Sequence, residues 1–311
     1  MTLLLTCVTP AYAVQASDRR LTYLDGEIAE EKANKATILG NFAAFSYTGL
    51  ARCSVGEPTD ELLMRCLAAQ GKNFSGLLDE LAKNASRDVR NLPLRVPKAN
   101  KRAVRRTSFV GSGFVGLRNP QVFNREKSSD DLHPFLAVVS NAQDLTEGWR
   151  AEADQEFTAH LGFLPEGAPF LLHAAGQALR PEERVRLERN LRRATERVCH
   201  PQPIARLLAR AVREVAARNV TVGPNVTCTL ITRSTALQPF ESIAGGMVPI
   251  AAEVQSEAEY FRRPPAPQAD DMRWIYSPAD PSAALHYGPN FALNGLMMKG
   301  FLFGPTDVVD S

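Results

Sequence analysis

Short apolar runs near the start of the chain have the length and composition of buried β-strands. Residues 2–9 are apolar and β-branched, residues 11–17 alternate small and apolar side chains, and Pro10 separates the two runs. This pattern predicts two strands joined by a tight turn. Polar residues 23–34 predict a loop, and the apolar run Ala36–Tyr47 predicts a third strand that ends at a Thr-Gly break.

A helical period follows this break. Apolar side chains recur at helical spacing after residue 60, first as Leu62, Leu63, Cys66 and Leu67 and then as Leu77, Leu78 and Leu81. Four later runs predict buried strands, and these are Thr107–Leu117, Pro134–Ser140, Phe157–Phe163 and Phe170–Ala175. Polar residues 118–132, between the first two of these runs, predict an inserted loop.

Two further helices and a strand are predicted after residue 180. Pro181 and Pro203 each suit the first turn of a helix, and the break at Gly223-Pro224 ends the second helix before an apolar strand at 226–231. The order of these elements predicts a layered α/β or α+β domain. We assign residues 1–235 to this domain and expect residues 236–311 to form a C-terminal extension that packs on it.

Composition and charge narrow the possible functions. The chain has 311 residues, of which 44% are hydrophobic, so it can bury a sizeable core. Its formal net charge of +2 gives no global argument for nucleic-acid binding. The basic run from Lys98 to Arg106 lacks interleaved aromatic residues, which favours a solvated loop. No stretch approaches the length of about 18 apolar residues that predicts a membrane span.

Cysteine and histidine spacing predicts neither disulfides nor a metal site. The five cysteines include no Cys-x-x-Cys, and the five histidines include no pair at metal-ligand spacing. This pattern favours reduced thiols and a cytoplasmic protein. An exported protein cleaved after Ala13 is an alternative, although no basic residue precedes Arg19 and Pro10 interrupts the apolar run.

The glycines at 111–116 do not predict a cofactor. The segment GSGFVG fits G-x-G-x-x-G, but no acidic residue lies at the required distance after a following helix. We therefore interpret it as a glycine-bearing strand and expect no cofactor. His173 lies in an apolar strand and is interpreted as a core histidine.

The candidate chemistry lies at the N-terminus. Removal of Met1 would expose Thr2, whose hydroxyl could attack a carbonyl carbon while its own α-amine takes the proton. Asp18 ends the second predicted strand, and strand alternation places it on the same side as Thr2. A lysine at 35 would disfavour the protonated amine and stabilise an alkoxide, and the backbone N–H of Gly49 could bind an oxyanion.

These residues resemble the pattern of proteasome β-type subunits and their bacterial relatives. That family begins with threonine on a strand, carries Asp-x-Arg, then a lysine, and then a strand ending in Gly-Leu-Ala. Counted from Thr2, Asp18 and Arg20 fall on the family positions, Lys35 fits with one residue inserted, and Gly49-Leu50-Ala51 ends the strand. Lys32, inside the acidic loop, is the weaker lysine candidate. The resemblance implies a four-layer αββα sandwich of the N-terminal nucleophile (Ntn) hydrolase type.

A fainter resemblance lies further along the chain and includes three departures. Asn219 stands where the family has aspartate, and Val222 and Ala175 stand where it has serines. These family groups support the terminal amine, so Arg20, Asn219 and Ala175 are predicted to take supporting positions here. The resemblance implies hydrolysis of a peptide or small amide in a homo-oligomer. The alternative is a catalytically inactive structural or assembly subunit with the same fold.

Overall fold

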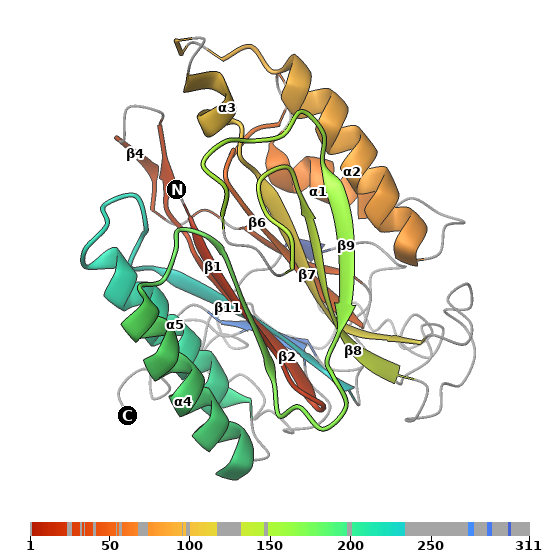
Figure 1. The fold of residues 1–311 in the computed structure, drawn as a ribbon, viewed down its shortest axis with the longest axis vertical. Helices are drawn as coiled ribbons and strands as arrows, with labels where there is room; N and C mark the ends of the chain where they lie inside the picture. The colour runs from red at the N-terminus through yellow and green to blue at the C-terminus, as the bar shows by residue number, and fades with distance from the viewer. Residues whose placement is uncertain are drawn as a thin grey trace, which may run out of the picture.

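Antiparallel sheets and helices make up the chain in the computed structural model, which confirms the prediction of an α+β fold (Figure 1). The described residues are 2–23, 27–31, 33, 35–39, 42–53, 55, 58–67, 74–94, 96–97, 100–116, 132–145, 149–197 and 201–233, with three short strands at 273–276, 285–287 and 298–299.

The first six-stranded sheet contains the N-terminal strand pair at interior positions. Its order is β10-β1-β2-β11-β12-β13. The predicted pair is confirmed, because β1 and β2 are antiparallel with Leu5 opposite Ala16. The hydroxyl of Thr9 closes the turn by accepting the N–H of Tyr12 at 2.8 Å. The strands are β1 (Leu3–Val8), β2 (Tyr12–Asp18), β10 (Leu171–Gly176), β11 (Val226–Thr232), β12 (Arg273–Tyr276) and β13 (Leu285–Tyr287).

The second six-stranded sheet has the order β14-β5-β6-β7-β8-β9. Its strands are β5 (Ala36–Leu39), β6 (Ala43–Thr48), β7 (Ser108–Gly116), β8 (Leu132–Ser140), β9 (Thr158–Phe163) and β14 (Met298–Lys299). The prediction of a single strand over 36–47 is wrong. The run is a hairpin, because the sequence Gly40-Asn41 interrupts it with two residues that favour turns.

Two pairs of helices pack on the sheets from outside (Figure 1). The pair α4 (Pro181–Arg197) and α5 (Gln202–Ala216) lies against the first sheet, where α5 contacts β1, β2 and β11. The pair α1 (Thr59–Leu67) and α2 (Phe74–Asn91) lies against the second sheet, where α2 contacts β8 and β9. Between the sheets, β1 contacts β6 and β2 contacts β7.

Strand alternation divides the core into two clusters. On β1, Leu3 and Leu5 pack toward α5, whereas Leu4 and Val8 pack toward the second sheet. Because both faces of β1 and β2 are buried, every residue of these strands is buried. This two-sided burial explains why the first run, LLLTCV, is almost continuously apolar rather than alternating.

Three smaller predictions differ from the structure. Strand β3 (Leu21–Thr22) lies just before the predicted loop and pairs with β4 (Ile28–Glu30) inside it. The exposed residues of β4 leave no apolar alternation to detect. The basic run contains the short helix α3 (Lys101–Val104). Leu132 already belongs to β8, while 117–131 lie outside the described residues.

The C-terminal part of the chain adds strands to both sheets. β12 pairs with β11 and β13 with β12, whereas β14 pairs with β5 on the other sheet. The rest of this region lies outside the described residues, so the assignment of 236–311 to a packed extension stays a prediction. None of the described helices has the length and apolar character needed to cross a membrane.

Candidate active site

Three of the predicted site residues meet at the ends of β1, β2 and β5. The Nζ of Lys35 lies 2.7 Å from Oγ1 of Thr2 and 3.1 Å from Oδ2 of Asp18. All three residues are buried, and Thr2 is 5% exposed. Lys35 immediately precedes β5, and its carbonyl accepts the N–H of Tyr47, which fixes the lysine next to the hairpin partner strand. The site is therefore a closed polar contact rather than an open pocket.

The carboxylate of Asp18 is surrounded by donors. Oδ1 accepts the N–H of Leu3 at 2.9 Å. Oδ2 accepts the N–H groups of Arg20 and Gly223 at 3.2 and 3.4 Å, in addition to the Lys35 ammonium. Asp18 thus ties together β1, β2 and the loop before β11.

The prediction that alternation puts Thr2 and Asp18 on one side is wrong. Thr2 continues the row of Leu4, which packs between the sheets, whereas Asp18 continues the row of Ala16, which packs toward α5. Asp18 lies at the strand end, and its carboxylate bonds the backbone N–H of Leu3 instead. Lys35 bridges the two side chains, so their proximity depends on the lysine and not on strand register.

The contacts of Lys35 are those of an ammonium group. Its three donor positions are matched by three oxygens, because it also donates to the carbonyl of Arg20 at 2.6 Å. Burial lowers the pKa of Lys35, and the neighbouring carboxylate of Asp18 opposes that shift. A charged lysine in contact with Oγ1 favours the alkoxide of Thr2 but is not an acceptor for its proton.

A second set of contacts holds the main chain of Thr2. Its carbonyl accepts the hydroxyl of Thr48 at 3.2 Å and the N–H of Gln177 at 2.9 Å. Gly176 has φ of +84°, and a Cβ there would lie 2.0 Å from the Thr2 carbonyl oxygen. Only glycine allows β10 to approach Thr2 this closely. The contacts orient Thr2 independently of its side chain.

Gly49 occupies a position that excludes other residues. Its φ is +105°, and a Cβ would lie 2.1 Å from the carbonyl oxygen of Arg106. The preceding residue, Thr48, contacts Thr2, so Gly49 follows directly on the wall of the site. The role of its N–H in binding an oxyanion stays a prediction.

The side chains of Arg20 and Asn219 make their contacts away from the hydroxyl of Thr2. The guanidinium of Arg20 pairs with Glu31 at 2.7 Å and donates to the carbonyls of Val220 and Val222. The side-chain oxygen of Asn219 accepts the N–H of Thr221 at 3.0 Å. Both residues therefore shape the loop before β11, which delivers the N–H of Gly223 to Asp18.

The remaining predicted position, Ala175, lies on β10 and offers no polar group. It is buried, pairs with Leu4 and packs in the cluster between the sheets. Val222 is likewise buried, in the cluster beneath α5. These two side chains cannot donate or accept a hydrogen bond.

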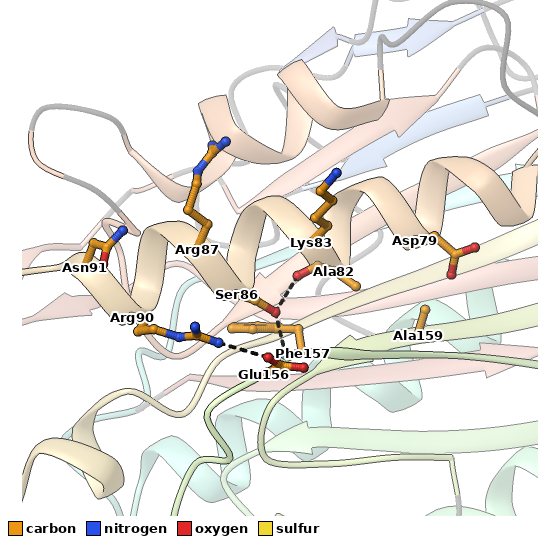
Figure 2. Close-up of a pocket in the computed structure, with 10 residues that line it drawn as sticks. All are labelled: Asp79, Ala82, Lys83, Ser86, Arg87, Arg90, Asn91, Glu156, Phe157 and Ala159. Atoms are coloured by element: carbon orange, nitrogen blue, oxygen red, sulfur yellow. Dashed lines mark hydrogen bonds and ion pairs between the residues drawn. The ribbon is translucent and has the colours of Figure 1, made fainter.

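An open groove lies elsewhere, between α2 and β9. Its volume is about 490 Å³, and Figure 2 shows Arg90 on α2 paired with Glu156 across it. Thr2, Asp18 and Lys35 are not among its lining residues. Within the described part of the chain, no three His, Cys, Asp or Glu side chains gather where they could hold a metal ion.

Sequence reasoning did not identify Thr48 or Gln177 as parts of the site. Thr48 was assigned to a break, although it directly precedes the predicted oxyanion glycine. Gln177 acts through its backbone, so its side chain carries no signal. The adjacency of Thr48 to Gly49 was the one available indication.

Comparisons with known proteins give a limited result. No protein-family model matches the chain, and no curated protein matches it. Among solved structures, the chain is similar to the Anbu (Gly-1) mutant from Hyphomicrobium sp. strain MC1, with 13% sequence identity and a TM-score of 0.45. The similarity covers 75% of this chain and 82% of that chain.

Proposed function

We propose that the chain is an amide hydrolase of the Ntn type, with Thr2 as the nucleophile after removal of Met1. The proposal includes a four-layer αββα arrangement and a peptide or small-amide substrate. The contact that carries it is the one between Lys35 Nζ and Thr2 Oγ1, at 2.7 Å. A buried ammonium in that position lowers the free energy of the alkoxide relative to the hydroxyl.

The reaction proceeds by acyl transfer. The α-amine of Thr2 takes the proton from Oγ1, and Oγ1 attacks the substrate carbonyl carbon. The resulting oxyanion is stabilised by the N–H of Gly49. Collapse of the intermediate breaks the C–N bond, and the proton passes from the α-amine to the leaving amine. Water then cleaves the acyl ester of Thr2 and regenerates the free hydroxyl.

Two measurements test this function. Intact-mass analysis of the natural protein should show loss of Met1, because the base is the free amine of Thr2. A β-lactone or peptide epoxyketone should then label Thr2, and Thr2→Ala should abolish labelling. Retained Met1, or labelling that survives Thr2→Ala, would rule the proposal out.

A second function is favoured by the apolar side chains of Ala175 and Val222. Without polar support for the amine, the chain could serve as an inactive structural subunit of an assembly. A protein that has lost Met1, binds partners of its own kind and resists every hydroxyl-directed electrophile would support that alternative. Both functions imply a homo-oligomer, which light scattering at micromolar concentration would test.

A further inference from the structure

A polar row crosses the inner face of the first sheet. Direct cross-strand pairing aligns His173 of β10 with Thr6 of β1, Thr6 with Gln15 of β2, and Gln15 with Thr229 of β11. Alternation directs all four side chains toward the second sheet. Each strand has an apolar residue on the same face that packs in the cluster between the sheets, and these are Leu4, Ala13, Ile231 and Ala175. Each of the four is at least nine-tenths buried.

Only part of this row is bonded within the protein. Gln15 reaches the second sheet, where its amide donates to the carbonyl of Val110 at 3.0 Å and accepts the hydroxyl of Ser46 at 2.9 Å. The ring of His173 contacts the amide of Gln143 at 3.3 Å. The hydroxyls of Thr6 and Thr229 have no hydrogen-bond partner among the described residues.

A third unpartnered hydroxyl lies on the same face of β2, next to Gln15. Ser17 precedes Asp18 on β2 and follows Gln15 on the same face, so it is the diagonal neighbour of Thr6 on one side and of Thr229 on the other. Ser17 is 2% exposed, and its hydroxyl also lacks a partner among the described residues. The three unpartnered hydroxyls thus belong to residues that neighbour Gln15 on one face of the sheet.

We propose that this cluster, made of Thr6, Ser17 and Thr229, is a buried hydration site between the two sheets. A buried hydroxyl without a hydrogen bond costs about 1 to 3 kcal/mol, so three in one place strongly favour a shared ligand. The ligand that suits three hydroxyls, each able to donate and accept, is water. An ionic ligand is disfavoured, because no charged side chain joins the cluster among the described residues.

The spacing of the strands fits water bridges. Diagonal neighbours on adjacent antiparallel strands have separations of about 7 to 8 Å, and their hydroxyls can approach more closely. A water that makes two hydrogen bonds of about 2.8 Å spans roughly 5.6 Å between the bonded oxygens. One water between Ser17 and Thr6 and another between Ser17 and Thr229 would satisfy all three hydroxyls. The site lies one residue from Asp18 along β2.

Isosteric substitution separates a hydrated site from a dry one. Thr6→Val and Thr229→Val each replace a hydroxyl by a methyl group of similar volume. If waters are bound, each variant leaves a water short of a partner, and the urea midpoint of unfolding falls. If the site is dry, each variant removes an unsatisfied hydroxyl, and the midpoint rises. Thr59→Val is the matched control, because that hydroxyl donates to the carbonyl of Leu50 at 2.6 Å and its loss should lower the midpoint.

A direct measurement accompanies the stability series. Oxygen-17 magnetic relaxation dispersion of the whole chain should detect long-lived internal water, and the signal should decrease in Thr6→Val and Thr229→Val but not in Thr59→Val. A crystal structure should show density within hydrogen-bond distance of Ser17 Oγ. Raised midpoints in both variants, together with an unchanged dispersion signal, would overturn the proposal.

Discussion

The two sides of Thr2 differ in polarity. On the side of β2 and β5, Asp18 and Lys35 are buried and bonded to each other, to Thr2 and to three backbone N–H groups. On the side of β10, Ala175 is buried and apolar, and Val222 lies in the separate cluster beneath α5. The polar side contacts the hydroxyl of Thr2 through Lys35, whereas Ala175 offers no side-chain hydrogen bond. The two sides can therefore be tested separately by mutation.

The largest expected effect is on the polar side. Lys35→Met keeps the length of the side chain but removes the donor to Oγ1, so labelling of Thr2 by a β-lactone should fall by about two to three orders of magnitude. The variant also leaves Asp18 without its ionic partner, which should lower the free energy of unfolding by about 3 to 5 kcal/mol.

Two controls separate these effects. Asp18→Asn, which disrupts the same ion pair but keeps the lysine, should lose stability while retaining more labelling than Lys35→Met. Urea unfolding of each variant shows whether the protein is folded under the conditions of labelling. Equal labelling of Lys35→Met and the parent protein would show that Lys35 does not act on the hydroxyl.

The next effect concerns β10 and the pH dependence of the free energy of unfolding. Burial lowers the pKa of His173 on β10 from its ordinary value of 6.5 to about 4. Between these values the unfolded chain binds a proton that the folded chain does not. The contribution of His173 to the free energy of unfolding is therefore fully present above the unfolded pKa. It decreases as the pH falls toward 4, by about 3 kcal/mol in all.

Substitution of the histidine tests this assignment. His173→Gln should flatten the decrease in the free energy of unfolding between pH 6.5 and 4. A slope that persists in His173→Gln would assign the pH dependence to another group.

A smaller effect is expected at Thr48, whose hydroxyl donates a hydrogen bond to the Thr2 carbonyl. Thr48→Val removes one neutral hydrogen bond, of about 1 kcal/mol, so labelling should slow by about fivefold. Thr48→Ser keeps the hydroxyl and should retain the parent rate. If both variants slow equally, the methyl group of Thr48 and not its hydroxyl positions Thr2.

Much of the fold followed from local patterns. The strands β1, β2 and β7 and the helices α4 and α5 lie within a few residues of their predicted positions, because continuous apolar runs and proline-initiated helices are local signals. The hairpin β5–β6 was missed, because apolar residues on both sides of Gly40-Asn41 resemble one strand. Exposed β4 was missed because it has no buried face.

The candidate site was predictable only in part. The spacing of Thr2, Asp18 and Lys35 is visible in the sequence, but Lys35 and not strand alternation brings the three side chains together. Thr48, the backbone of Gln177 and the N–H of Gly223 come from segments far apart in the chain, and two of these three act through main-chain atoms. Main-chain contacts of this kind depend on the tertiary fold and leave little signal in residue type.

The smallest effect is expected from a substitution that places a polar group on the side of β10. Ala175→Ser adds one hydroxyl beside Gly176, which itself contacts the Thr2 carbonyl. A new neutral hydrogen bond to the amine is worth about 0.5 to 1.5 kcal/mol, so labelling should accelerate by about two- to tenfold. Ala174→Ser is the control, because its side chain packs toward the helices on the opposite face of β10 and should leave the rate unchanged. A slower rate in Ala175→Ser, with lowered stability, would mean that the hydroxyl is buried without a partner. The apolar wall would then be a packing surface, and the division of Thr2 into a hydroxyl side and an amine side would be wrong.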